Sequence, residues 1–175
     1  VFTLGLLVFI GCGSFIYFNT SVTNKFLTDF QREEQQAVFE KKYKHMSNAP
    51  QPKITDVLLN VELYPNQLGL HAAGSYVLKN KSNQPIDSVQ VLIQAEAKVN
   101  NLQFSRQAQL MLIDTNYTYR IFKLAQPLLP GDTMTLAFNV DVYSHGFKQN
   151  FTGLGTPIYN GTFINNQTFA PTIGY

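Results

Sequence analysis

The feature that most constrains this fold is an alternation of apolar and polar residues that begins near Ile54 and ends at Val142. Successive side chains of a strand point to opposite faces, so the alternation predicts half-buried β-strands. The alternating runs cover residues 57–63, 70–78, 89–93, 110–112, 117–121 and 134–142. Turn signals rich in Asn, Pro and Gly separate several of them, at residues 64–67, 80–85 and 126–132.

Six or so strands with no helical stretch between them predict a mainly β fold, either an antiparallel sandwich or a saddle-shaped sheet. The apolar positions of these strands are Val57, Leu59, Val61, Leu63, Leu70, Ala72, Gly74, Tyr76, Leu78, Val89, Val91, Ile93, Leu110, Leu112, Tyr117, Tyr119, Ile121, Met134, Leu136, Phe138, Val140 and Val142.

The charged residues are confined to the middle of the chain. Lys and Arg number 13 and Asp and Glu number 11, together 14% of the 175 residues. A soluble domain usually has roughly 25%. None of these residues lies in residues 1–24 or 149–175, so the low average reflects two uncharged ends.

Composition excludes several classes of protein. A hydrophobic content of 45% is too high for a disordered chain. A net charge of +2, without Lys and Arg clusters among aromatic residues, gives no support to a nucleic-acid partner. The single Cys12 excludes a disulfide framework and a zinc site with several thiolates.

Residues 1–18 form an apolar run near the length that spans a bilayer as a helix. Phe15, Tyr17 and Phe18 close it with rings of the kind found at the lipid headgroup level. We therefore predict a transmembrane helix, with the lipid bilayer as its partner. A cleaved signal peptide is the alternative, although the run lacks a basic start and a small-x-small cleavage site.

Residues 19–52 are predicted to form a juxtamembrane helix and a Pro-containing linker. Phe26, Phe30, Phe39 and Tyr43 recur at roughly helical spacing among polar residues of the segment 23–46. The lysines near its end indicate a solvated helix terminus or, alternatively, a contact with the membrane surface. Prolines in residues 48–52 then break the helix and make a short, stiff linker.

The uncharged C-terminal stretch would make an awkward free surface. Residues 158–163 carry an Asn-Gly hairpin signal between β-forming residues, and residues 169–175 continue without a polar face. We expect this end to pack on another part of a longer protein. The chain opens without Met and ends without a polar tail, so we also expect both ends to be cuts through that protein.

No catalytic, cofactor-binding or metal-binding residue is predicted. His45, His71 and His145 are isolated, and no His-Glu-x-x-His, Gly-x-Ser-x-Gly, Walker or dinucleotide motif occurs. Glu62 and Glu96 suit solvent faces of strands, which leaves no basis for an acid–base pair.

Asn-x-Ser/Thr sites occur six times, and they matter only if the source glycosylates secreted chains. They lie at Asn19, Asn80, Asn116, Asn150, Asn160 and Asn166.

Five stretches agree in order and spacing with a known family. They are FEKKYKHM at residues 39–46, PQPKITDVLLNVELYP at 50–65, GSYVLKNKSNQPIDSVQV at 74–91, YRIFKLAQPLLPGDTMTLAF at 119–138 and NGTFINNQTFAPTIGY at 160–175. They resemble the N-terminal β domain of aminopeptidase N-like zinc peptidases. The similarity is greatest to the membrane-embedded kind, in which the peptidase follows the spans of an ABC transporter permease.

The resemblance implies a parent enzyme that removes N-terminal residues from peptides with one zinc ion. The zinc ligands, a His-Glu-x-x-His pair and a downstream Glu, and the Gly-x-Met-Glu-Asn loop that grips the free amine are not in this sequence. Zinc is therefore expected in a catalytic domain outside the segment, and whether the segment belongs to an active enzyme stays open. In the family a Gln near the end of the β domain approaches the substrate amine. Asn160 or Thr162 stands there in this chain, so that role is not carried over.

Two functions remain open. The first is the non-catalytic β domain, residues 53–175, and the membrane anchor of a zinc aminopeptidase, with the β domain closing one side of the peptide cleft and docked on the catalytic domain. The alternative is a non-enzymatic extracytoplasmic β-sandwich of a membrane transporter or permease that binds a partner. The family resemblance favours the outer side of the cell membrane. A secreted protein with a removed signal peptide is a third alternative.

We predict that Leu136→Asp unfolds the domain, because the substitution would place an unpaired charge in the core. Thermal unfolding followed by circular dichroism tests this, and a variant with normal solubility and melting would show that the strand is misassigned.

Overall fold

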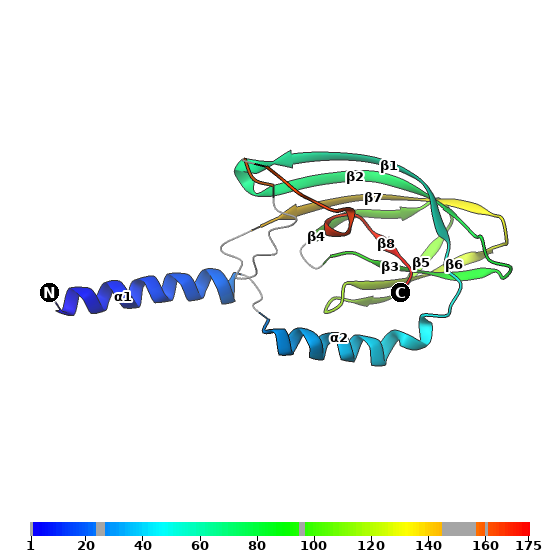
Figure 1. The fold of residues 1–175 in the computed structure, drawn as a ribbon. Coiled ribbons are helices and arrows are strands. Elements are labelled where there is room, and N and C mark those ends of the chain that lie inside the picture. The colour runs from blue at the N-terminus through cyan, green and yellow to red at the C-terminus, as the bar shows by residue number, and fades with distance from the viewer. Residues whose placement is uncertain (1, 24–26, 95–96, 145–156, 160) are drawn as a thin grey trace.

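The computed structural model describes residues 2–23, 27–94, 97–144, 157–159 and 161–175. Two helices precede the sheets, α1 (Phe2–Tyr17) and α2 (Asp29–Tyr43) (Figure 1). The strands are β1 (Lys53–Tyr64), β2 (Gly69–Lys79), β3 (Ile86–Leu92), β4 (Ala97–Phe104), β5 (Ala108–Asp114), β6 (Tyr119–Leu128), β7 (Thr133–Tyr143) and β8 (Thr172–Ile173).

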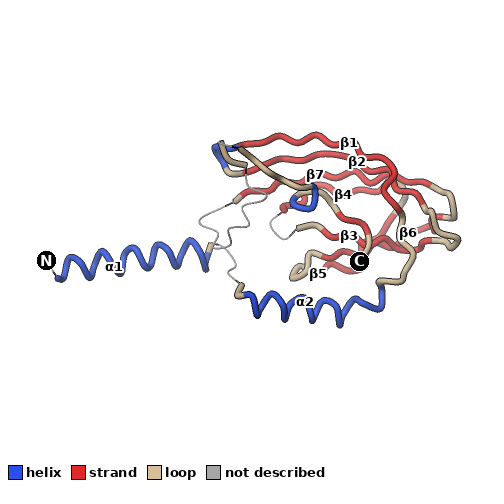
Figure 2. The backbone as a smooth tube through the Cα atoms, in the orientation of Figure 1, coloured by secondary structure: helices blue, strands red, loops and turns tan. Residues whose placement is uncertain are grey.

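The strands form two antiparallel sheets, as the alternation predicted. The first sheet has the order β1-β2-β7-β4 and the second sheet the order β5-β6-β3-β8. Figure 2 shows the two layers of strands with α2 lying beside the second one. The prediction of a mainly β fold preceded by an apolar helix is confirmed.

One hydrophobic core fills the space between the sheets. Tyr76 and Phe138 contact each other on adjacent strands, with ring centroids 4.9 Å apart. Phe104 of the first sheet meets Phe122 of the second at 5.1 Å, which links the two layers. Leu136 is fully buried here, where the sequence placed it. The strand core residues are Leu70, Ala72, Tyr76, Leu78, Ile86, Val89, Val91, Phe104, Phe122, Leu124, Leu128, Met134, Leu136, Phe138, Val140 and Val142.

The strand β4 was not predicted from the sequence. Its residues include Lys98, Asn100 and Asn101, and a register shift between Val99 and Asn101 interrupts its alternation. A bulge changes which face later side chains occupy, so a search for period two fails across it. Similarly, Tyr117 lies in the turn before β6 rather than in a strand.

The strand β1 lies at the edge of the first sheet and is more exposed than its alternation suggested. It pairs with β2, and its side chains are mostly exposed along its whole length. Val57 and Leu63 are 53% and 46% exposed, whereas the residues opposite them on β2, Tyr76 and Leu70, are buried. The apolar face of β1 therefore continues the core face of the sheet beyond the buried core.

The apolar run at the N-terminus is helical. Together with a π-helical turn at Phe18–Val22 it forms a 21-residue helix, Phe2–Val22, with mean hydropathy 1.7 and none of it buried. Asn19 and Thr20 donate side-chain hydrogen bonds to the carbonyls four residues earlier, which competes with regular α-helical bonding. By length and composition this helix is able to cross a membrane, a property that signal sequences share.

Gly74 is a position on β2 where a larger side chain would meet the backbone of the neighbouring strand. A Cβ atom there would lie 2.5 Å from the carbonyl oxygen of Leu58 on β1 and 3.1 Å from the ring of Phe138. We expect Gly74→Ala to destabilise the domain by about 1–3 kcal/mol, because the backbone of β1 must move.

Chemical denaturation measures this change in the free energy of unfolding. Ser75→Ala, a substitution on the next residue of β2, is the control and should change the value by less than about 0.5 kcal/mol. Equal stabilities of the Gly74→Ala variant and the wild type would contradict the close approach of the two strands.

Candidate functional site

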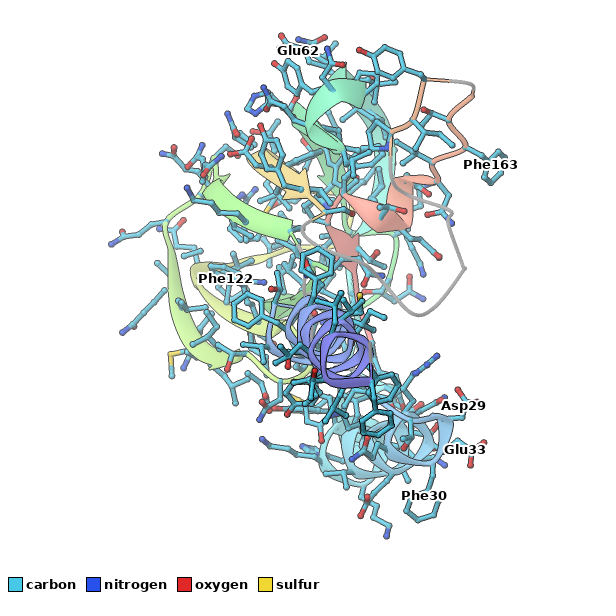
Figure 3. All side chains as sticks on the ribbon, turned by 90° about the vertical axis from the view of Figure 1, so that its left-hand side faces the viewer. Asp29, Phe30, Glu33, Glu62, Phe122 and Phe163 are labelled. Atoms are coloured by element: carbon cyan, nitrogen blue, oxygen red, sulfur yellow. The ribbon has the colours of Figure 1, made fainter. Side chains whose placement is uncertain are left out.

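The helix α2 is docked on the outer face of the second sheet. It begins at Asp29 because Thr28 caps it: the Thr28 side chain accepts a hydrogen bond from the Gln31 amide, and the Gln31 side chain accepts one from the Thr28 amide. Phe39 and Tyr43, one turn apart, face the sheet. Phe30, by contrast, points away from it (Figure 3) and is 74% exposed.

An aromatic cluster holds α2 to the sheet. The ring centroids of Tyr43 and Tyr119 lie 4.6 Å apart, and Phe39 lies 5.4 Å from Tyr117 and 5.6 Å from Tyr119. Tyr175 stacks on Phe39 at 5.4 Å, so the C-terminal residues join the same cluster. Tyr119 and Ile121 are thus buried, but beneath α2 and outside the core between the sheets. The first part of β6, residues 119–122, therefore has buried side chains on both faces.

Asp114 fixes α2 by hydrogen bonds. Its Oδ2 atom accepts from the Tyr43 hydroxyl at 2.6 Å and from Lys42 Nζ at 2.7 Å, and its Oδ1 accepts from the Asn116 amide at 3.2 Å. Burial raises the pKa of Asp114, but the bonds from Lys42, Tyr43 and Asn116 outweigh it and hold the pKa below the ordinary range. The Asp114 carboxylate is therefore ionised at neutral pH and paired with Lys42. Burial also raises the pKa of the nearby Tyr119, to about 12.

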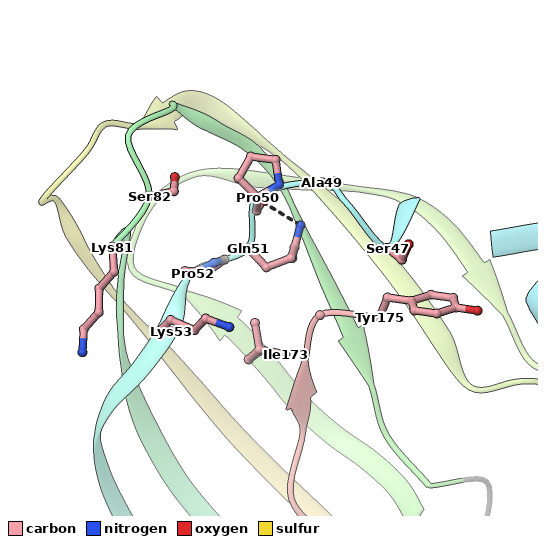
Figure 4. A pocket seen from close by; sticks show the side chains of 11 residues that line it. Ser47, Ala49, Pro50, Gln51, Pro52, Lys53, Lys81, Ser82, Ile173 and Tyr175 are labelled. Carbon is pink, nitrogen blue, oxygen red and sulfur yellow. Dashed lines mark hydrogen bonds between the residues drawn. The ribbon is translucent and has the colours of Figure 1, made fainter. Parts of the chain in front are cut away.

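The linker after α2 is attached to the second sheet. Gln51 donates to the carbonyl of Ser88 at 3.1 Å and accepts from the amide of Gln90 at 2.8 Å. Beside it lies a pocket of about 410 Å³ between residues 47–53, the turn residues Lys81 and Ser82, and residues 173–175 (Figure 4). The described residues around this pocket include no carboxylate, His or Cys side chain, so it offers no acid–base pair and no metal ligands.

A polar row crosses the outer face of the first sheet. Glu62 on β1 lies opposite His71 on β2, His71 opposite Asp141 on β7, and Asp141 opposite Lys98 on β4. His71 Nδ1 and Asp141 Oδ1 are 2.6 Å apart. A hydrogen bond from Asn100 and the contact with His71 lower the pKa of Asp141. The row sets carboxylates opposite His71 and Lys98 on neighbouring strands, and such cross-strand side-chain pairs stabilise a sheet.

Among the titratable residues singled out from the sequence, those that the structure describes, His45, His71 and Glu62, do not form a reaction centre. His71 has a partner, Asp141, that lies 70 residues away in the sequence, so the spacing of histidines gave no signal of it. His45 and Glu62 are exposed, while His145 and Glu96 lie outside the described residues. Within the described part of the chain, His, Cys, Asp and Glu side chains form no group of three that could hold a metal ion. The described ranges of the chain therefore do not hold a set of side chains that fits a zinc site.

The C-terminal segment has two parts. Phe169 and Ala170 are buried in the core and β8 pairs with β3, so residues 169–175 pack on this chain itself, contrary to the expectation from the sequence. The residues before them expose apolar side chains. Ile158, Tyr159 and Phe163 are 42%, 77% and 67% exposed, and Phe163 points away from the body of the domain in Figure 3. The described residues of 158–163 form a loop rather than the hairpin suggested by the Asn-Gly signal. Asn160 lies outside the described residues. The Thr162 hydroxyl is engaged within this loop, because it donates to the carbonyl of Ile158 and accepts from its amide.

The Asn-x-Ser/Thr sites differ in exposure. Asn80 is fully buried, and its amide donates to the carbonyls of Gln84 and Leu128. This asparagine is therefore a structural residue of the turn after β2 and is closed to glycosylation. Asn116 and Asn166 are exposed, whereas Asn150 and Asn160 lie outside the described residues.

Comparison with known proteins gives matches among solved structures alone. No family model matches the chain, and no curated protein matches it. An M1 zinc metallopeptidase from Deinococcus radiodurans is 16% identical with a TM-score of 0.41, over 53% of this chain and 21% of that chain. A two-domain M1 zinc metallopeptidase variant bound to L-tryptophan is also 16% identical, with a TM-score of 0.42 over 59% and 23%. This chain thus spans less than a quarter of the length of these structures.

We predict that Tyr43→Phe destabilises the protein by about 1.5–3 kcal/mol, because it removes a hydrogen bond to a buried charged group. Tyr117→Phe is the matched control, since Tyr117 belongs to the same cluster but makes no side-chain hydrogen bond among the described residues. Denaturant unfolding measures both variants, and equal effects would contradict the role of the hydroxyl.

The effect should depend on pH. Because the folded-state pKa of Asp114 is lowered, its contribution is present above the pKa of the unfolded chain and is lost as the pH falls through the folded pKa. The stability difference between Tyr43→Phe and the wild type should therefore shrink in that acidic range. A difference that stays constant down to the lowest pH at which the protein folds would argue against an ionised acceptor.

Proposed function

We propose that this chain is the non-catalytic N-terminal β domain and membrane anchor of a zinc-dependent aminopeptidase. In this proposal, α1 spans the membrane, the two sheets form the β domain, and the zinc ion belongs to a catalytic domain elsewhere in the same protein. Peptide N-terminal hydrolysis is then an activity of the whole protein. The proposal also places the β domain on the extracytoplasmic side and relates the protein to peptidases that follow the spans of an ABC transporter permease.

The observation that carries the proposal is the uncharged, exposed apolar surface made by Ile158, Tyr159 and Phe163 in the first part of the C-terminal segment. This segment contains the stretch at residues 160–175 that resembles the family, and its neighbours Ile158 and Tyr159 and its member Phe163 present apolar side chains to solvent. The core of the sandwich does not need these three side chains, since none of them belongs to it. Exposed apolar groups of this kind mark interaction surfaces, and a catalytic domain is the partner that the resemblance implies.

The attachment of α2 supports the role of an anchor. A flexible juxtamembrane segment would leave the β domain free to rotate above the membrane. Instead, Tyr43, Lys42 and Asp114 join the helix to the second sheet, and Gln51 joins the linker to β3. From the start of α2 onward, the segment that leads into the β domain is therefore attached to the second sheet at several points. In the proposal, this arrangement makes α2 and the linker part of the same unit as the β domain.

The chain itself supplies no step of the hydrolysis. Its proposed part is to close one side of the peptide cleft and to hold the catalytic domain through the apolar C-terminal surface. Thr162 is not assigned a contact with the substrate amine, because its hydroxyl is already bonded to the backbone of Ile158.

The gene and the longer protein test this proposal. We expect a His-Glu-x-x-His sequence within a couple of hundred residues after Tyr175, and hydrolysis of aminoacyl p-nitroanilides that a chelator abolishes and zinc restores. Phe163→Asp should lower this activity or the melting temperature, since a charge would enter the docked surface. Leu129→Asp, at an exposed leucine in the turn after β6, is the matched control and should leave both unchanged.

Absence of the motif, or a Phe163→Asp protein that equals the control, would contradict the proposal. The orientation of the anchor is tested separately in sealed cells. The Cys12→Ser, Asn83→Cys variant places a single thiol in the exposed turn after β2, and a membrane-impermeant maleimide should label it from outside.

A further inference from the structure

We infer that the free edge of β1 is a binding site for an extended segment of another protein, one that carries apolar side chains on one face and basic side chains on the other. The bound segment would add a fifth strand to the first sheet. This inference concerns a strand edge apart from the C-terminal surface, and it does not depend on the proposed function.

The edge of β1 is long and unpaired. The strand has 12 residues, and it pairs with β2 on one side. Within the described residues, no backbone atom of Lys53–Tyr64 makes a hydrogen bond outside this pairing. Figure 1 shows β1 at the outer margin of the first sheet. An exposed row of free backbone donors and acceptors is a template for an added strand.

The other sheet edges are better protected against such pairing. The strand β5 has seven residues, with a register shift in its middle between Leu110 and Leu112. The strand β4 has a shift between Val99 and Asn101 and exposes polar side chains. The shift in β1 lies at its very start, between Ile54 and Asp56, so the rest of the strand is regular. Proteins usually protect edges with bulges, Pro or Lys, and Val57–Tyr64 has none of these.

The side chains of β1 define the chemistry of the partner strand. On the face that continues the core, Val57, Leu59 and Leu63 are 53%, 37% and 46% exposed, which calls for apolar side chains opposite them. On the outer face, Asp56 and Glu62 are exposed carboxylates six residues apart. An added strand would place two of its outer-face residues directly opposite these acids.

The polar row of the first sheet indicates the sign of those residues. Across the strands the row runs Glu62, His71, Asp141 and Lys98, so acidic and basic groups alternate from β1 to β4. Glu62 lies at the edge of the sheet, at the end of this series. Among the described residues, no strand places a basic side chain on the free side of Glu62. A Lys or Arg on the added strand would continue the alternation.

A second copy of this chain fits the edge less well. If two β1 strands paired antiparallel about Leu59, Asp56 of each copy would face Glu62 of the other, which places like charges opposite each other twice. Pairing about Asn60 avoids this clash but sets Glu62 against Leu58 and leaves both acids without a basic partner. Charge therefore favours a different, basic segment over self-association.

The test uses the full chain in detergent micelles and a capped peptide, Lys-Val-Thr-Val-Thr-Val-Lys. In this palindromic sequence the two Lys residues match the spacing of Asp56 and Glu62, and the three Val residues match Val57, Leu59 and Val61 in either strand direction. Hydrogen exchange with mass spectrometry should show new protection in residues 54–64. A peptide with the central Val replaced by Pro, and one with Glu in place of both Lys, are the ligand controls.

On the protein side, the double variant Asp56→Lys, Glu62→Lys should weaken binding of the basic peptide roughly tenfold or more, because two cross-strand attractions become repulsions. Asp87→Lys is the matched control, since Asp87 is an exposed acid on β3 of the other sheet. Melting curves verify that both variants fold. If the double variant does not fold, single Glu62→Gln and Asp56→Asn variants replace it, each with a smaller expected loss.

Three results would overturn the inference. The first is binding of the basic peptide without new protection in residues 54–64, or binding of the Pro-containing peptide as tight as that of the basic peptide. The second is strong protection, in the chain alone and at every concentration, of the β1 amides that face away from β2, which would mean that the chain covers its own edge. The third is protection that grows with protein concentration without peptide, which would assign the edge to a second copy.

Discussion

The core between the central strands is the constraint on which the rest of this structure depends. Strands β2 and β7 of the first sheet and β3 and β6 of the second contribute most of the fully buried side chains, among them Leu70, Leu136 and Val89. Their alternating pattern requires that each sheet bury one face against the other. Beyond this core, at β1 and at Ile158, Tyr159 and Phe163, further apolar side chains are exposed to solvent. The two proposed interaction surfaces therefore lie outside this core.

A second, smaller cluster determines how the N-terminal region is attached. The outer face of a two-layer sandwich is normally solvated, yet Tyr119 and Ile121 make the outer face of β6 apolar, and α2 covers it. The Asp114 carboxylate gives this contact its direction, because Tyr43 and Lys42 both donate to the same oxygen atom. Apolar burial brings the helix to the sheet, and the charged hydrogen bonds fix which turn of the helix lies at the end of β5.

Much of the fold could be predicted from the sequence, and the limits have physical causes. The buried residues of β2 and β7 follow from alternation, since these two strands pair with each other without a register shift. The strand β4 could not be found, because its bulge at Val99 and Asn101 shifts the period. The helix α2 could be predicted from its spacing, but its docking could not, since Phe39 and Tyr43 identify an apolar face without identifying its partner. The pairs Tyr43–Asp114 and His71–Asp141 join residues about 70 positions apart, a distance at which sequence spacing carries no information.

The central claim is that the exposed apolar side chains Ile158, Tyr159 and Phe163 belong to a docking surface for a catalytic domain. Hydrogen exchange of residues 161–167 tests it most directly, when the 175-residue chain is compared with the longer protein that contains that domain. The account predicts that these residues exchange more slowly in the longer protein, while the buried amides of β2 and β7 exchange alike in both. Equal exchange of residues 161–167 in the two proteins would contradict the claim.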